Sequence, residues 1–424
     1  MSVGVRRFRI HARDRMLRGQ VVVGIVGPIV TTDVAHYVQA LQKIARIGPR
    51  TRIAISSRPR GKSWYYDASA TDSWCEQLVT QLPAATAETV VDVGLAQVSM
   101  ITPQHPLHFF VAGDYLIEVG DHVLGDGKGF LDRLTTLAHM GIGDTEYPDW
   151  LTSHSERFPL WKAARTTFLA NPQARRDLFA ARRADRRWQN DDPDTKSEMV
   201  SWTAQRASVH VVVPASQLRE IRQCVRQSDQ GATVSSALLV VVRAALVRAG
   251  IRLQHEQTMI YDARQYLPSG SGEVRGNFVT GLPVRVDDPE DPAQLGVAIK
   301  AQITSARPLA ALLVGVGRYT IARTQTREGS KRRKAPTAHM VFNNLGVARA
   351  LQRLPWTADP EHRTAAVMVP TGGPEHITVT VVVVASVLQI TASFHSNVFD
   401  PEVVRRALGY IAHGSITEML GRQS

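Results

Sequence analysis

Apolar and polar positions alternate along this 424-residue chain with the periods of strands and helices. Residues 107–111 and 115–119 are apolar and aromatic runs separated by Ala-Gly-Asp, which predicts a β-hairpin. The leucines and phenylalanine of residues 130–139 recur at helical spacing. The chain is therefore expected to run from strand to glycine-rich turn to helix in this region.

The earlier part of the chain shows the same mixture. Helical spacing marks residues 33–47, with Thr31, Thr32 or Asp33 as the cap, and residues 73–82. Strands are predicted over residues 7–11, 21–30 and 52–56. The first half is thus a mixed set of strands and helices.

A polar, breaker-rich stretch at residues 189–198 follows an arginine-rich helical segment at 168–188. The chain is longer than one hydrophobic core usually supports. We therefore predict two domains, residues 1–190 and 191–424, joined by a linker at about residues 189–200.

Beyond the linker the strand and helix patterns begin again. Strands are predicted over 207–213, 257–261, 275–285, 338–342, 365–369, 377–385 and 388–393. Helices are predicted over 216–228, 233–249, 292–304, 309–323 and 401–413, and a charged loop over 328–334. The predicted fold class is α/β (α+β), with two mixed halves.

Composition adds a basic character to this picture. With 44% hydrophobic residues, 21% charged residues and a net charge of +12, the chain can fill two cores and has a surplus of cations. Such a surplus suits an acidic carrier protein, nucleotide phosphates or an anionic membrane. Nucleic acid is disfavoured, because the basic clusters at 175–187 and 331–334 are not interleaved with stacking aromatics.

Other classes are excluded by what the sequence lacks. Cys75 and Cys224 are far apart, which implies neither a disulfide framework nor a zinc site, and a reducing cytoplasm is the expected compartment. No run approaches the roughly 18 apolar residues of a transmembrane helix. We expect no metal and no transmembrane segment.

The candidate chemistry lies where the predicted hairpin ends, in the sequence Asp121-His122-Val-Leu-Gly-Asp126-Gly127. A neutral imidazole at a strand end can remove a proton from a hydroxyl or an amine as it attacks an acyl group. Asp126 could orient His122 or hold the turn by pairing with an arginine. From residue types alone, a purely structural His-Asp turn also stays open.

This segment resembles the HHxxxDG motif of the condensation-domain and CoA-dependent acyltransferase superfamily, with Asp121 in place of the first histidine. Three later segments resemble the superfamily in the same order. They are Gly-Ala-Thr-Val-Ser-Ser-Ala-Leu-Leu at 231–239, Gly-Asn-Phe-Val-Thr-Gly-Leu-Pro at 276–283 and Phe-Asn-Asn-Leu-Gly at 342–346. The resemblance covers about residues 5–413.

The resemblance implies two chloramphenicol-acetyltransferase-like subdomains arranged in a V, with a tunnel between them. It assigns the general base to His122 and a structural role to Asp126, for which Arg264 is the candidate partner. It also implies that Gly127 keeps the turn open beside the tunnel.

Asn343 and Asn344 fall in the region of the family that lines the opposite wall, where an amide N–H can stabilise an oxyanion. A turn-capping asparagine pair is the other interpretation. No cofactor is expected to stay bound, and the implied co-substrate is acyl-CoA or a phosphopantetheine thioester.

The expected activity is transfer of an acyl group from a CoA or carrier-protein thioester to a hydroxyl or amine of a small-molecule acceptor. Because Asp121 replaces the first histidine of the motif, an alternative is a catalytically inactive condensation-like module that binds a carrier protein. As a neighbour of the base, its carboxylate could instead favour the protonated form of His122. The basic charge also keeps open a lipid-acting acyltransferase at a membrane surface.

Overall fold

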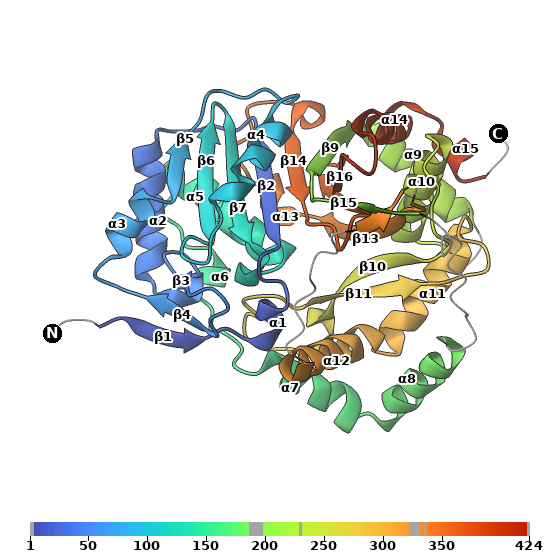
Figure 1. Ribbon diagram of the computed structural model, residues 1–424, viewed down its shortest axis with the longest axis horizontal. Helices are drawn as coiled ribbons and strands as arrows, with labels where there is room; N and C mark the ends of the chain where they lie inside the picture. The colour runs from blue at the N-terminus through green and yellow to red at the C-terminus, as the bar shows by residue number, and fades with distance from the viewer. Residues whose placement is uncertain (1–3, 186–197, 229–230, 323–330, 335, 422–424) are drawn as a thin grey trace.

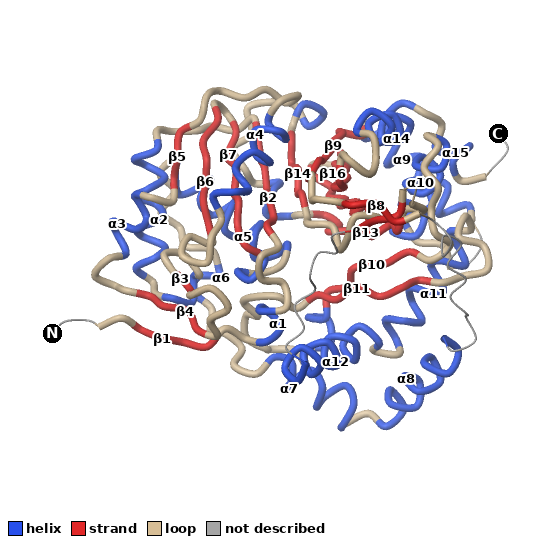
Figure 2. The backbone as a smooth tube through the Cα atoms, in the orientation of Figure 1, coloured by secondary structure: helices blue, strands red, loops and turns tan. Residues whose placement is uncertain are grey.

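The computed structural model describes residues 4–185, 198–228, 231–322, 331–334 and 336–421 (Figure 1). Two halves lie side by side, each built on a β-sheet with helices packed against it, and loops join the elements (Figure 2). The predicted class of fold, with strands and helices mixed in both halves, is confirmed.

The first sheet has five strands in the order β14-β2-β7-β6-β5. The bounds are Val21–Gly27 for β2, Val79–Gln81 for β5, Leu107–Ala112 for β6, Tyr115–Asp121 for β7 and Thr364–Met368 for β14. The predicted hairpin of β6 and β7 is present, and Gly113 at its turn has φ 67°, a left-handed conformation that favours glycine. This hairpin carries the chain to the candidate site.

Helices cover both faces of this sheet. Helices α2 (Val34–Arg46), α3 (Thr71–Glu76) and α5 (Gly127–Gly141) belong to one side, and α4 (Val90–Ala96) packs on the other with the 3₁₀ turn η2 (Gln97–Met100). Asp33 is the cap of α2, because its side chain accepts a hydrogen bond from the His36 amide. Apolar side chains between the sheet and its helices form two cores, one on each face.

The second sheet has six strands in the order β11-β10-β13-β15-β16-β9. The bounds are Arg206–Val213 for β9, Gln257–Asp262 for β10, Val279–Val284 for β11, His339–Val347 for β13, His376–Val384 for β15 and Val387–His395 for β16. Helices α9 (Ala215–Gln227), α10 (Val234–Arg248), α14 (Pro401–His413) and α15 (Ile416–Met419) bury one apolar face of it. Because side chains alternate along a strand, the other face carries polar residues, such as Thr378 and Thr380 on β15 and Gln389 and Thr391 on β16.

The halves are joined by strand exchange as well as by packing. Strand β14 comes from the last third of the chain but pairs with β2 in the first sheet. Helix α4 of the first half contacts β9 of the second. The expected linker falls largely on residues 186–197, which lie outside the described residues, so the boundary near residue 190 stays a prediction.

The remaining elements lie around the two large sheets, with α7, α8 and α12 at the bottom of the view in Figure 1. Strands β1 (Arg6–Arg9), β3 (Ser56–Ser57) and β4 (Ser63–Tyr66) form a three-stranded sheet, and β8 (Met199–Ser201) pairs with β12 (Lys331–Arg333). The remaining helices are α1 (Ala12–Arg15), α6 (Asp149–Thr152), α7 (Pro159–Ala164), α8 (Pro172–Asp185), α11 (Pro292–Thr304), α12 (Arg307–Ala322) and α13 (Arg349–Gln352). The short turns are η1 (Pro49–Thr51), η3 (His122–Leu124), η4 (Arg165–Leu169), η5 (Ala263–Tyr266) and η6 (Pro360–His362).

Three predicted elements are wrong. Residues 52–55 form no strand, because Arg52 and Ala54 have φ of 60° and 52°, and only Ser56 of the predicted range lies in a strand, the two-residue β3. The helix predicted over 73–82 ends early as α3, since residues from Val79 pair with β6 instead. The charged loop at 328–334 includes strand β12, and its first three residues lie outside the described part.

Within the described residues, no single helix is long and apolar enough to cross a membrane. Helices α11 and α12 meet that length and composition only as a pair, and a bend of 60° separates them.

Candidate active site

His122 stands at the junction of a strand and a turn. Strand β7 ends at Asp121, and η3 (His122–Leu124) leads through Gly125 to α5. The His122 amide donates to the Gln20 carbonyl at 2.7 Å, and its own carbonyl accepts from Asn277 Nδ2 at 2.7 Å. Gly125 has φ 152°, which is open chiefly to glycine. The backbone of the histidine is therefore fixed from both halves of the molecule.

The imidazole ring of His122 makes no hydrogen bond to a described residue. The residue is 9% exposed, and Nδ1 is buried without a hydrogen-bond partner. Nε2 makes no hydrogen bond to a described residue and is not fully buried, so solvent reaches it. Phe130 lies edge-on to the ring, with centroids 6.4 Å apart. Nε2 is therefore the nitrogen available to an approaching acceptor.

A network that the sequence did not indicate holds the remaining carbonyls of the turn. Arg52 Nη1 donates to the carbonyls of Val123 and Leu124 at 3.2 and 3.0 Å. Arg52 Nη2 pairs with Asp14 at 3.0 Å, and Asp14 accepts from the Asn277 amide at 2.8 Å. These contacts join α1, the residues after η1 and the second half around the histidine turn.

The expected ion pair between Asp126 and Arg264 is present. Arg264 Nη1 lies 2.9 Å from Asp126 Oδ2, and Nη2 donates to Oδ1 at 3.1 Å. The Phe278 amide also donates to Oδ2 at 2.9 Å. Burial by itself raises the pKa of Asp126, but the Arg264 charge and these hydrogen bonds outweigh it and lower the pKa. The carboxylate therefore stays ionised, and its hydrogen-bond and ion-pair partners come from the second half.

Arg264, like Asp126, has several hydrogen-bond and ion-pair partners. It also pairs with Asp262 at 3.2 Å and donates to the carbonyls of Val274 and Gly276 at 3.2 and 2.9 Å. Gly276 has φ 112°, and a Cβ there would come within 2.6 Å of Arg52 Nη2. Glycine is thus required where the two networks meet.

Asp121 points away from the imidazole. Its carboxylate accepts from the Gly19 amide at 3.0 and 3.1 Å and from the Val123 amide at 2.9 Å, which caps η3. Burial raises the pKa of Asp121, and the two amides and Arg18 partly oppose the shift. Asp121, which replaces the first histidine of the motif, therefore fixes the backbone at Gly19 and Val123.

Asp121→Ala is therefore expected to lower the free energy of unfolding by about 1–2 kcal/mol, because two backbone amides lose their acceptor. The rate of the reaction at His122 should change by only a few-fold. Urea denaturation and turnover measured side by side check this. A large rate loss at unchanged stability would assign Asp121 to the chemistry instead.

Gly127 begins α5 and faces the other half. A Cβ at this position would lie 3.2 Å from Leu345 Cδ2, so the absence of a side chain permits close approach of β13. Asn343 and Asn344 precede Leu345 on that strand and point to opposite faces of the sheet. Asn344 Nδ2 donates to Ser235 Oγ on α10 at 2.9 Å, and its Oδ1 accepts from the Gly346 amide. Asn344 is thus engaged in packing, and Asn343, on the polar face, is the one left to meet a substrate.

A buried ion pair that the sequence did not indicate lies beneath the site. Arg133 on α5 donates to Glu118 Oε1 on β7 through Nε at 2.9 Å and Nη2 at 2.7 Å, and its guanidinium lies 4.6 Å from the centre of the Phe130 ring. Glu118 Oε2 is buried without a partner. Burial raises the pKa of Glu118 to about 7, against the opposing charge of Arg133.

This shift predicts a pH dependence of stability. The folded state holds the Glu118 proton more tightly than the unfolded chain, so stability from this group is full at acidic pH and is lost as pH rises through about 7. Between pH 5.5 and 8 the loss should be roughly 2 kcal/mol relative to Glu118→Gln, which has no titrating group. Urea denaturation of both proteins across this range checks it. Parallel curves would show that the pair stays ionised throughout.

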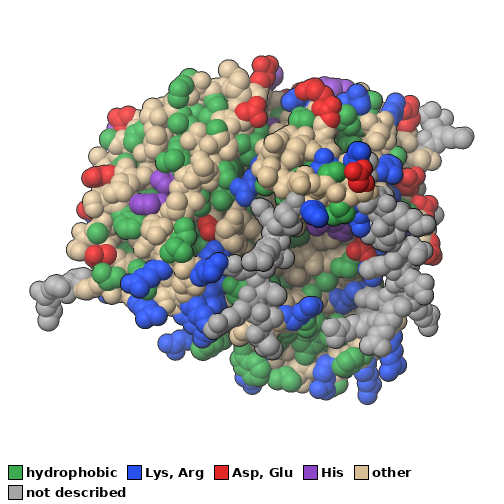
Figure 3. All heavy atoms as spheres, viewed as in Figure 1, with side chains coloured by type: hydrophobic (Ala, Val, Ile, Leu, Met, Phe, Trp, Pro, Cys, Tyr) green, Lys and Arg blue, Asp and Glu red, His purple; other side chains and the backbone are tan. Residues whose placement is uncertain are grey.

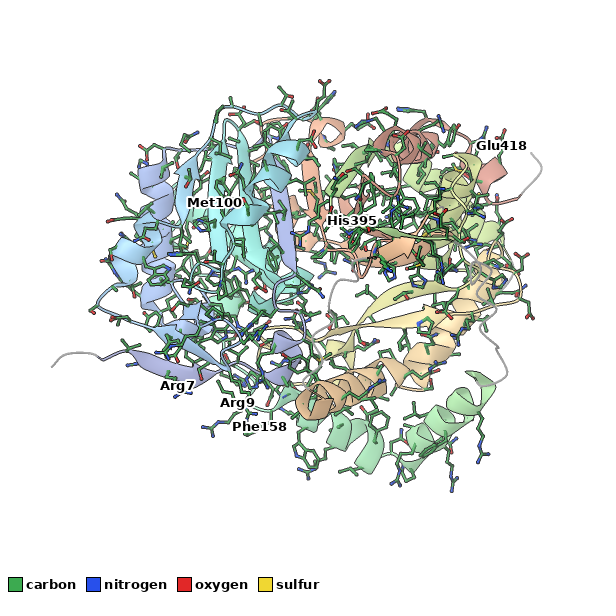
Figure 4. All side chains as sticks on the ribbon, in the orientation of Figure 1. Arg7, Arg9, Met100, Phe158, His395 and Glu418 are labelled. Atoms are coloured by element: carbon green, nitrogen blue, oxygen red, sulfur yellow. The ribbon has the colours of Figure 1, made fainter. Side chains whose placement is uncertain are left out.

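A shallow, open hollow lies at the seam between the two halves. Its walls come from β2, α4, η2, β14, β9 and β16, and they include Val21, Leu95, Met368, Ser208 and Phe394. His395, labelled in Figure 4, lies in the same part of the seam. Val21 pairs with Asp121 in the sheet, but His122 does not line this hollow. A tunnel that reaches His122 therefore stays a prediction.

In the described part of the chain, no three His, Cys, Asp or Glu side chains are grouped so that they could hold a metal ion.

No protein-family model and no curated protein sequence matches this chain. Solved structures do resemble it. The trichothecene 15-O-acetyltransferase TRI3 of Fusarium sporotrichioides superimposes with a TM-score of 0.62 at 12% identity, over 100% of this chain and 98% of that one. The first condensation domain of the calcium-dependent antibiotic synthetase gives a TM-score of 0.58 at 11% identity, over 100% and 98%.

The epimerization domain of the third module of tyrocidine synthetase B gives a TM-score of 0.55 at 14% identity, over 96% and 92%. At these identities the similarity establishes the fold. The chain has the two-part, chloramphenicol-acetyltransferase-like fold of condensation domains, as its sequence motifs predicted.

Proposed function

We propose that this protein transfers an acyl group from a CoA or carrier-protein thioester to a hydroxyl or amine of a small-molecule acceptor. The observation that carries the proposal is the placement of His122. Its backbone is fixed by Gln20 and Asn277, and its Nε2 is open to solvent where the two halves meet. The fold is shared with an acetyltransferase and with condensation domains, which supports the same class of reaction.

The proposed chemistry needs one base and no bound metal or cofactor. His122 Nε2 accepts the proton of the acceptor hydroxyl or amine while its oxygen or nitrogen attacks the thioester carbonyl. The tetrahedral intermediate carries the negative charge on the former carbonyl oxygen, and Asn343 Nδ2 is the proposed donor to it. The intermediate then collapses with cleavage of the carbon–sulfur bond, and the thiolate takes the proton from the imidazolium. Ester or amide and free thiol are the products.

Asp126 has no direct part in this scheme. Its two oxygens accept from Arg264 and the Phe278 amide, and it makes no hydrogen bond to the imidazole. Its proposed role is to hold the start of α5 against the second half. Gly127 then leaves room for Leu345 beside the site.

The test is incubation with a panel of acyl-CoA and acyl-carrier-protein donors, together with candidate alcohols and amines, followed by intact-mass analysis of donor and acceptor. Loss of the acyl group from the donor with matching gain by an acceptor supports the proposal and identifies the donor class. Tight binding of a carrier protein without transfer to any acceptor would instead support the inactive, carrier-binding module.

A further inference from the structure

The segment α7–η4–α8 projects from the second half of the molecule. Figure 1 shows α8 at the lower margin, away from both large sheets, and its main contact among the described elements is η4. The segment is anchored at its start, where the Glu156 amide donates to the Glu273 carbonyl and Lys162 pairs with Glu156. Pro159 and Ala163 of α7 are buried, so only one side of the segment is committed to packing.

The same segment exposes four large apolar residues. Phe158 is 64% exposed, Trp161 62%, Leu169 59% and Phe179 62%. Three of the four largely exposed aromatic side chains in the described part of the chain lie here. Phe158, labelled in Figure 4, is at the lower edge of the molecule. Large apolar residues exposed together on one short segment mark a candidate contact surface.

Arginines surround these apolar side chains. Around Phe179, Arg175 and Arg176 precede by four and three residues and Arg183 follows by four, which places them on one face of α8. All three are exposed, as are Arg157 and Arg165 nearby. None of the five has an ion-pair partner among the described residues. In Figure 3, green and blue side chains share the lower margin of this face.

We propose that this arm surface, defined by Phe158, Trp161, Leu169 and Phe179 with Arg157, Arg165, Arg175, Arg176 and Arg183, docks on an anionic lipid surface. Aromatic and leucine side chains insert at the boundary between headgroups and acyl chains, and arginines pair with anionic headgroups. The aromatic side chains stand on a projecting helical segment and not in a groove. A deformable bilayer interface can accept such a convex surface, whereas a folded partner would need a matching groove.

The arm surface is connected to the candidate active site through a small core. Ala163 of α7 packs in one cluster with Ala263 of η5 and with Phe278. Phe278 donates its amide to Asp126, and Ala263 precedes Arg264, the partner of Asp126. Docking of the arm would therefore bring a lipid surface next to the elements that hold the histidine turn, which suits an amphiphilic donor or acceptor.

The test is sedimentation of the full chain with vesicles of phosphatidylcholine alone and with vesicles of equal parts phosphatidylcholine and phosphatidylglycerol. We expect binding to the anionic vesicles only, weakened by added salt. Arg175→Gln with Arg176→Gln should weaken binding about twenty-five-fold, at about five-fold for each arginine. The matched control, Arg58→Gln with Arg60→Gln, removes two exposed arginines between β3 and β4 and should bind as the unaltered chain does.

Insertion of the aromatic residues has its own readout. Phosphatidylglycerol with brominated acyl chains should quench tryptophan fluorescence, and Trp161→Phe should remove most of the quenching while keeping an aromatic ring. Absence of vesicle binding would overturn the proposal. Binding to neutral vesicles that equals binding to anionic vesicles, and that is unchanged in both arginine variants, would overturn it as well. So would binding of an acidic carrier protein that the Arg175/Arg176 variant loses while vesicles remain unbound. None of these readouts uses acyl transfer, so they are independent of the proposed reaction.

Discussion

Asp126→Ala is expected to lower the free energy of unfolding by about 3–5 kcal/mol. The substitution leaves the Arg264 guanidinium, whose side chain is 15% exposed, without its main counter-charge, and leaves the Phe278 amide without an acceptor. Asp262 and two carbonyls still contact the guanidinium, but removing the buried partner of a largely buried cation costs far more than the net gain from forming the pair. Urea denaturation, followed by circular dichroism, measures the difference.

Asp262→Ala is the matched control, because Asp262 pairs with the same guanidinium at 3.2 Å but its side chain is 52% exposed. An exposed pair contributes little, so the control should lose about 1 kcal/mol. The structural role of Asp126 would be contradicted if its alanine variant were no less stable than the control, or if it folded normally and lost only its rate.

His122→Ala is expected to lower the rate of acyl transfer by about 10²- to 10⁴-fold, the usual contribution of a general base. Its free energy of unfolding should stay within about 1 kcal/mol of the unaltered chain, because the ring makes no hydrogen bond to a described residue. The loss should fall on kcat, since the proton is transferred only as the acceptor attacks.

His36→Ala is the control for this variant. His36 lies on α2, is exposed and, among the described residues, forms an ion pair with Asp33 alone. It should keep both rate and stability. An effect of His36→Ala as large as that of His122→Ala would show that the assay responds to charge or folding and not to the base.

Local periodicity was enough to predict most of the fold. The β6–β7 hairpin and helices α2, α5 and α10 follow from spacing that a neighbouring segment cannot easily override. Residues 73–82 failed because the second half of that apolar run pairs with β6, a contact across about 30 residues. The strand predicted over residues 52–56 was wrong because Arg52 adopts a left-handed conformation, in which its guanidinium contacts the histidine turn.

Some residues of the candidate site could be predicted from the sequence, and others could not. His122, Asp126 and Arg264 are reachable from a motif, because the chemistry restricts their residue types and spacing. Asp14 and Asn277 are not, since they meet across 263 residues and carry no local pattern. The resemblance also gave Asn343 and Asn344 one role, whereas the alternation of β13 puts them on opposite faces.

The central claim is that His122 removes the acceptor proton during acyl transfer. Its most direct test is the mass of the acceptor after parallel reactions of the unaltered chain and His122→Ala with the same thioester donor. The account predicts acylated acceptor from the unaltered chain and a trace or none from the variant in the same time. Equal yields from the two proteins would contradict it.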